Sequence, residues 1–280
     1  MLQLLSPADS LLPSPSRPGT HGGHAAHFGV LHCLGWTTTL RGNINERIGL
    51  VFAYPPTSSG RPISLKERIK ISLPTSTSSS KDYRQSIPFL GARFRLAQCL
   101  TQMFGNLLIV EYLHKGLRSD SVFFFDEDKV DSPFLGGFTE ARPEMIDGQV
   151  SSNLDDADEE FDHYRPYSPA MVGKSPNTAQ KQPWNAYAEL YGLGVILLEI
   201  GLWKTIGHVR GRGSLRDLHE RLIPEAAKSL PYRTGEIYFN VVKECLDGGE
   251  KWRRQEGLGA RDFWFEFSEK ILRPLAQCCA

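Results

Sequence analysis

The hydrophobic pattern changes along the chain from strand-like to helix-like. Residues 29–36 and 47–54 are short, mostly apolar segments of the kind that form strands. The pair Gly42-Asn43 lies between them, which predicts a hairpin. In the second segment large apolar residues alternate with smaller ones and predict one packed face: Ile48, Leu50, Phe52 and Tyr54.

Apolar residues recur every three to four positions in much of the remaining chain, which is the spacing of one helix face. Two of these segments start with a capping box, in which a Ser is followed three residues later by an acidic residue: Ser64 with Glu67, and Ser214 with Asp217. Two short apolar runs on either side of an acidic turn, 121–125 and 133–138, instead predict a second pair of strands. The predicted helices are 64–71, 90–108, 188–204, 215–223, 235–246 and 262–277.

This order of elements, a few strands followed by many helices, is typical of the α+β class. Residues 1–26 contain several prolines and show no periodicity, so we expect a disordered tail. Residues 143–183 are expected to be rich in loops. Within them, the acidic run 155–162 is interpreted as a solvated face.

Charge and composition narrow the classes of function. The 280 residues include 32 Lys and Arg and 32 Asp and Glu, a balance that gives no support to nucleic-acid or membrane-surface binding. The most apolar segment, 190–203, is shorter than the roughly 20 residues that cross a bilayer and contains Glu199, so a buried helix is predicted and not a membrane span.

The five cysteines form no Cys-x-x-Cys pair, and reduced thiols in a cytoplasmic protein are expected. His21, His24 and His27 would need a helix to align them on a metal ion, and the pattern around them predicts a flexible tail instead.

Four segments resemble, in order, the landmarks of the protein-kinase fold. IGLVFAYPP at 48–56 is similar to the last N-lobe strand and the hinge, and LHKGLRSDSVFFF at 113–125 is similar to the catalytic loop and the strand after it. FLGGFTEARP at 134–143 is similar to the metal-binding Asp-Phe-Gly segment, and AELYGLGVILLEIGLW at 188–203 is similar to the central C-lobe helix. The combination resembles divergent kinase-like domains of filamentous-fungal proteins, which often follow a HeLo-type helical domain, and it covers roughly residues 29–280.

The resemblance implies remnant N-lobe strands and a hinge at 27–56, and a mostly helical kinase-like C-lobe at 57–280. Residues 143–183 would then correspond to the activation segment. Neither a Gly-rich phosphate loop nor a strand lysine is found before residue 48. We therefore expect an N-lobe that is truncated or supplied by another chain.

The resemblance also identifies which catalytic groups are missing. His114 matches the histidine of the catalytic loop, but Gly116 stands where the catalytic aspartate is expected, and Ser121 where the metal-binding asparagine is expected. Gly137 stands where the metal-binding aspartate of the Asp-Phe-Gly segment is expected. Phosphoryl transfer depends on Mg²⁺ to offset the phosphate charge, so losing both metal ligands argues against catalysis.

The remaining matched residues suggest a structural role. Glu189 stands where the family has an aspartate that ties the central helix to the catalytic-loop backbone, and its carboxylate could accept the same N–H bonds. Arg118 and His114 are expected to brace the loop. Asp120 is the one nearby acid that could act as a displaced ligand, although a solvated turn explains most such acids.

Two hypotheses about the function remain open. The first is a pseudokinase, a catalytically degenerate signalling module that binds protein partners and needs no cofactor. Its candidate surfaces are the acidic run 155–162, the helix ends and the aromatic cluster Phe263, Trp264, Phe265 and Phe267. The second is an atypical kinase that binds ATP and Mg²⁺, or an incomplete fragment of one.

Overall fold

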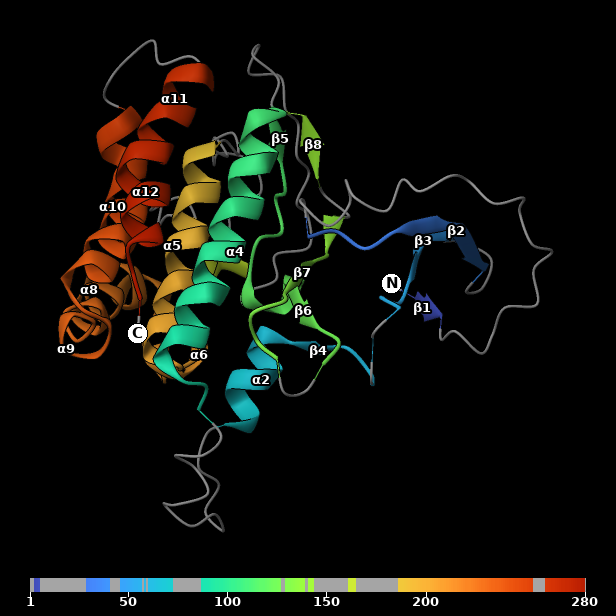
Figure 1. Cartoon of the computed structure of the whole chain (residues 1–280), viewed down its shortest axis with the longest axis horizontal. Helices are drawn as coiled ribbons and strands as arrows, with labels where there is room; N and C mark the ends of the chain where they lie inside the picture. The colour runs from blue at the N-terminus through green and yellow to red at the C-terminus, as the bar shows by residue number, and fades with distance from the viewer. Residues whose placement is uncertain are drawn as a thin grey trace.

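The computed structural model describes residues 3–5, 29–40, 46–56, 58, 60–72, 87–126, 129–138, 141–143, 161–164, 186–253 and 260–279. Small sheets followed by a helical body confirm the predicted α+β class. Figure 1 shows strands β1–β3 projecting from one side of the molecule, with α4 and α5 side by side between the smaller sheets and the C-terminal helices. His21, His24 and His27, and residues 155–160 of the acidic run, lie outside the described residues.

The projecting sheet consists of β1 (Gln3–Leu5), β2 (Cys33–Leu40) and β3 (Glu46–Ala53), in the order β1-β3-β2. The antiparallel pairing of β2 with β3 confirms the predicted hairpin, although β2 begins and ends four residues later than the predicted strand 29–36. Strand β1 lies in the segment expected to be disordered, and it runs parallel to β3.

Two smaller sheets lie against the helical body. Strands β4 (Ile63–Ser64), β6 (Val122–Phe124) and β7 (Phe134–Leu135) form one of them, and the antiparallel β6–β7 pair was predicted from the sequence. The other pairs β5 (Tyr112–Leu113) with β8 (Arg142–Pro143). The β5–β8 pair therefore joins the two segments that flank the candidate loop.

The helices follow the predicted segments closely, and both capping boxes form at Ser64 and Ser214. Among the short helices after α5, the one at Pro231–Thr234 packs against α5. The helices are α2 (Leu65–Ile71), α4 (Leu90–Ile109), α5 (Ala186–Leu202), α6 (Ile206–Arg210), α7 (Leu215–Asp217), α8 (Ile223–Ala227), α9 (Pro231–Thr234), α10 (Glu236–Arg253), α11 (Ala260–Phe267) and α12 (Arg273–Ala276).

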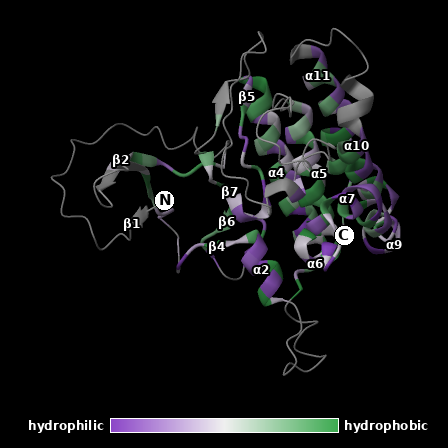
Figure 2. Cartoon of the chain, turned by 180° about the vertical axis from the view of Figure 1, so that it is seen from behind, coloured by the Kyte–Doolittle hydropathy of each residue, from purple (hydrophilic) through white to green (hydrophobic). Residues whose placement is uncertain are grey.

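Helix α5 is the centre of the core. All but two of its residues are buried, as expected for a helix that is apolar on every side. Figure 2 shows hydrophobic residues gathered where α4, α5 and α10 meet. Arg93 on α4 donates to the Ile200 and Gly201 carbonyls at the end of α5 (3.3 and 2.8 Å), so it satisfies groups that a helix end leaves open. None of the described helices combines the length and the apolar character needed to cross a bilayer.

Two helices widen into a π-helical turn shortly before a proline. The turn Leu218–Leu222 joins α7 to α8, with Pro224 two residues later, and Ser268–Leu272 joins α11 to α12, with Pro274 two residues later. A proline inside a helix removes an N–H and clashes with the carbonyl four residues earlier. The wider turn moves that carbonyl away, so each helix continues through its proline.

The aromatic cluster on α11 divides between the core and the surface. Phe263 and Phe267 are buried, Trp264 is half-buried against the core, and Phe265 is 62% exposed. One helix cannot direct neighbouring residues to the same side, so this division follows from the helical period. The cysteines are all free thiols, of which Cys33 and Cys279 are exposed.

Candidate functional site

The candidate loop runs from β5 through His114 to the short 3-10 turn Ser119–Ser121 and into β6. Its centre is tied to α5, because the Lys115 backbone N–H donates to Glu189 Oε1 over 2.5 Å. Glu189 is 1% exposed, and Lys115 has a positive φ of 58°. A non-glycine residue with this backbone conformation stores strain, and such strain persists only where surrounding contacts hold it. The Glu189 carboxylate supplies one of those contacts.

His114 is fully buried, and its hydrogen bonds identify the tautomer. The Gly116 N–H donates to Nδ1 (3.2 Å), so Nδ1 carries no proton, and the Nε2–H donates to the Gly136 carbonyl (2.9 Å). The ring also packs on Phe138, with centroids 4.5 Å apart. Burial lowers the pKa of His114 to about 4, while the bond to Gly136 acts in the opposite direction. At neutral pH the imidazole is uncharged and joins the loop to the segment after β7.

Gly116 and Gly137 lie against each other where the resemblance expects two carboxylates. A Cβ at Gly116 would lie 3.1 Å from the Gly137 carbonyl oxygen, which is tighter than nearly all real contacts. A Cβ at Gly137 would lie 3.2 Å from Ser121 Cβ, and its φ of +81° disfavours any side chain. A side chain at either position would therefore need its neighbours to shift by a few tenths of an ångström.

Ser121 uses its hydroxyl within its own turn. Its Oγ donates to the Arg118 carbonyl (2.7 Å) and accepts from the Arg118 N–H (3.1 Å). Ser121 is 4% exposed, and its own carbonyl accepts from the Gly136 N–H (2.8 Å). These bonds stabilise the turn and leave the hydroxyl poorly suited to bind a metal ion.

The Asp120 carboxylate already lies close to two cationic side chains. Lys66 on α2 lies 3.1 Å from its Oδ2, and the Arg118 Nε lies 3.8 Å from the same oxygen. Among the described residues, nowhere do three or more His, Cys, Asp or Glu side chains gather in a way that could hold a metal ion. The loop therefore offers neither a catalytic base at position 116 nor a grouped set of carboxylates for Mg²⁺.

Glu199 on α5 is a further buried polar residue, and it is connected to the loop through Tyr164 and Ser119. The sequence did not identify it as part of the site. Glu199 Oε1 accepts from the Tyr164 hydroxyl (2.9 Å) and the Ile206 N–H (2.6 Å), and Tyr164 in turn accepts from Ser119 Oγ (2.8 Å). Burial raises the pKa of Glu199 to about 7, against the opposing effect of these hydrogen bonds. A glutamate inside the apolar segment 190–203 was the signal available in the sequence, because such a group needs buried partners.

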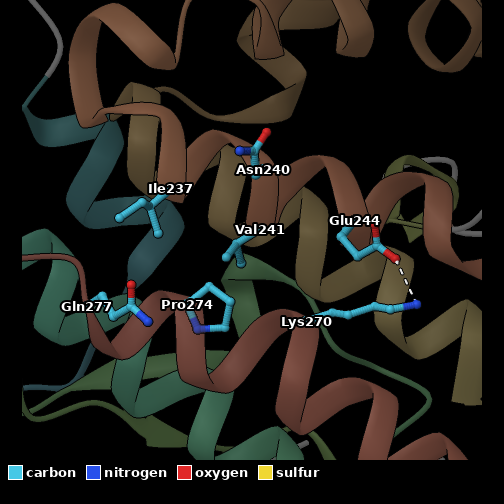
Figure 3. A pocket seen from close by; sticks show the side chains of 7 residues that line it. All are labelled: Ile237, Asn240, Val241, Glu244, Lys270, Pro274 and Gln277. Atoms are coloured by element: carbon cyan, nitrogen blue, oxygen red, sulfur yellow. Dashed lines mark ion pairs between the residues drawn. The ribbon is translucent and has the colours of Figure 1, made fainter.

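Two hollows on the described surface lie away from this loop. One, of about 410 Å³, lies between α10 and the turn that leads into α12, and it is lined by Ile237, Val241 and the Lys270–Glu244 ion pair, among others (Figure 3). Another, of about 480 Å³, lies between α4 and α11–α12. Neither is lined by a residue of the candidate loop.

Comparisons with known proteins give no family for this chain: no family model matches it, and no curated protein matches it. Functional inference therefore depends on the arrangement of its own residues.

Proposed function

We propose that this chain is a catalytically degenerate protein-kinase-like domain that acts as a protein-binding module in signalling. The observation that supports this most directly is the contact between Gly116 and Gly137. Where the resemblance calls for two acidic side chains, the backbone leaves no room for a Cβ without a shift of its neighbours. An enzyme of this class would need those carboxylates, because its catalysis consists almost entirely of positioning and charge stabilisation.

The same region retains the contacts that hold a loop in shape. Glu189, His114 and Ser121 are buried, and each bonds to backbone groups of the loop or of the segment after β7. Buried polar groups that are fully bonded make a structure unique and rigid. A loop that is held in shape and lacks catalytic groups fits a binding module better than an enzyme.

ATP binding and turnover test the proposal. We expect no rise in the melting temperature of the purified protein with ATP and Mg²⁺ beyond that with Mg²⁺ alone, because a ligand stabilises only the fold that binds it. We also expect no transfer of phosphate to the protein itself or to a general protein substrate.

A metal-dependent thermal shift together with phosphoryl transfer above background would overturn the proposal. If that transfer were lost in Asp120→Ala but retained in Asp131→Ala, an atypical kinase using Asp120 would replace it. Asp131 is a suitable control because it also pairs with an arginine, Arg95, at 3.1 Å, and belongs to the turn after β6.

A further inference from the structure

Strand β2 has one edge that no strand covers in the described part of the chain. The sheet order is β1-β3-β2, so β2 pairs with β3 on one side only. Its register shift lies at the start, between Cys33 and Gly35, and the remainder from Trp36 to Leu40 pairs regularly with β3. Every second residue of this regular part directs its N–H and C=O groups away from β3. Figure 1 shows the strand on the side away from the helical body.

The sequence of β2 lacks the charged residues and prolines that usually prevent an edge strand from pairing with another strand. Natural edge strands carry lysine, proline or inward-pointing charges that prevent another strand from adding. The sequence CLGWTTTL at 33–40 contains no charged residue and no proline. Two large apolar side chains at alternate positions are exposed, Leu34 at 55% and Trp36 at 69%.

The order of residues in this edge suits a second copy of the same strand. In an antiparallel pair related by a twofold axis at Thr38, position 36 lies opposite position 40 of the second copy, and positions 37 and 39 lie opposite each other. The segment Trp-Thr-Thr-Thr-Leu is then complementary to itself, with an apolar residue opposite an apolar residue at both ends and threonine opposite threonine between them.

Charge does not oppose this arrangement. The strand brings no like charges together across the axis, and the whole chain has a formal net charge of zero, so two copies do not repel each other strongly. A contact of one strand pair is small, so a concentration-dependent dimer is expected and not a permanent one. We propose that β2 is a self-association surface, through which two copies of the chain form a continuous six-stranded sheet.

Sedimentation of the full chain over a range of concentrations tests this surface. We expect wild-type protein to shift from monomer towards dimer as its concentration rises. Trp36→Lys should raise the dimer dissociation constant by about tenfold or more, because it adds a strongly hydrated charge to an apolar contact. Tyr232→Lys is the matched control, because Tyr232 is an aromatic residue with 93% exposure on α9, and it should leave association unchanged.

Disulfide trapping tests the orientation and register. With the exposed Cys33 and Cys279 replaced by Ser, Thr38→Cys should form a disulfide-linked dimer under mild oxidation, since position 38 meets itself at the axis. Thr37→Cys alone should trap far less, while a mixture of Thr37→Cys and Thr39→Cys proteins should give the mixed dimer.

Several results would overturn the proposal. One is a chain that stays monomeric at all concentrations. Others are an association that Trp36→Lys leaves unchanged, and equal trapping at all three positions. A circular-dichroism melt of each variant checks that the fold is retained.

Discussion

The buried carboxylate of Glu189 joins two segments that are 74 residues apart in the sequence. Its partner is a backbone N–H at Lys115, a residue that is 2% exposed, so water does not replace the bond easily when the carboxylate is lost.

We expect Glu189→Ala to lower the free energy of unfolding by about 2–3 kcal/mol, because it leaves a buried N–H without an acceptor. Glu189→Gln keeps a carbonyl oxygen and should lose only about 1 kcal/mol. Urea unfolding measures both values. Equal losses in the two variants would mean that packing, and not the hydrogen bond, is what Glu189 provides.

Glu199 makes the free energy of unfolding depend on pH, and its contribution can be separated from that of His114. Its pKa is about 7 in the folded protein, against 4.5 as the ordinary value. An acid whose pKa is raised by folding contributes stability below its unfolded pKa and loses it as the pH rises through the folded pKa. The window is therefore about pH 4.5 to 7, and the full effect is about 3 kcal/mol. The lowered pKa of His114 acts in the opposite direction, since stability falls as the pH drops from 6.5 towards about 4.

The difference in unfolding free energy between wild type and Glu199→Gln isolates the glutamate, because His114 is common to both proteins. This difference should favour wild type most at pH 5 and decline as the pH rises to 8. Urea titrations at several pH values give the curve. Glu220→Gln, at a glutamate whose side chain is 51% exposed, should show no such trend, and parallel stability curves for wild type and Glu199→Gln would contradict the assignment.

At the scale of elements, close packing between α5 and α10 depends on a glycine. A Cβ at Gly194 would lie 2.8 Å from Cys245 Cβ and 3.2 Å from Leu246. The Cβ of Cys245 is fixed to the backbone, so the added methyl group cannot be accommodated by a side-chain rotation. The two helices would have to move apart, and α5 is the centre of the core.

We expect Gly194→Ala to destabilise the protein by about 1–3 kcal/mol through this overpacking. Gly207→Ala is the matched control, because Gly207 is also in a helix and a Cβ there meets nothing within 4 Å. That variant should be neutral or more stable by up to about 1 kcal/mol, since alanine favours the helix. Thermal and urea unfolding compare the pair, and similar effects in both would show that α5 and α10 tolerate separation.

The elements themselves were largely predictable, because their causes are local. Short stretches of sequence contain the capping boxes at Ser64 and Ser214, the apolar period of α4 and the continuous apolar run of α5. Strand β1 was not predicted, because three residues in a segment without periodicity form it only through pairing with β3. The π-helical turns could have been anticipated from Pro224 and Pro274, but not their position, which depends on which carbonyl moves.

The candidate site was less predictable than the elements. The positions His114, Gly116, Ser121, Gly137 and Glu189 could be named in advance only through a resemblance to a family. The pairing of Lys66 with Asp120, 54 residues apart, and the bonds among Ser119, Tyr164 and Glu199 depend on how distant segments meet. Such contacts leave no periodic signal, and single buried polar residues are the only trace of them in the sequence.

At the scale of the whole molecule, stability is expected to differ between the projecting sheet and the helical body. The segments that flank the projecting sheet contact the smaller sheet: the Leu135 N–H of β7 donates to the Gly29 carbonyl (2.7 Å), and Tyr54 makes an edge contact with Phe125, the residue after β6 (centroids 5.3 Å apart). Helix α5, in contrast, is enclosed on every side. Proteins open locally where few buried contacts oppose it, and buried helices open only with the whole fold.

Amide hydrogen exchange on dilute protein, below the range in which β2 would associate, should show this gradient. Amides of Leu193 to Ile200 should exchange at a free energy close to that of global unfolding, while those of β2 and β3 should exchange through a much smaller opening. Raising the concentration should slow exchange at alternate residues between Trp36 and Leu40 and leave α5 unchanged, because only the N–H groups that point away from β3 gain partners. Equal protection of β2 and α5 in dilute solution would mean that the sheet and the helices unfold as one unit.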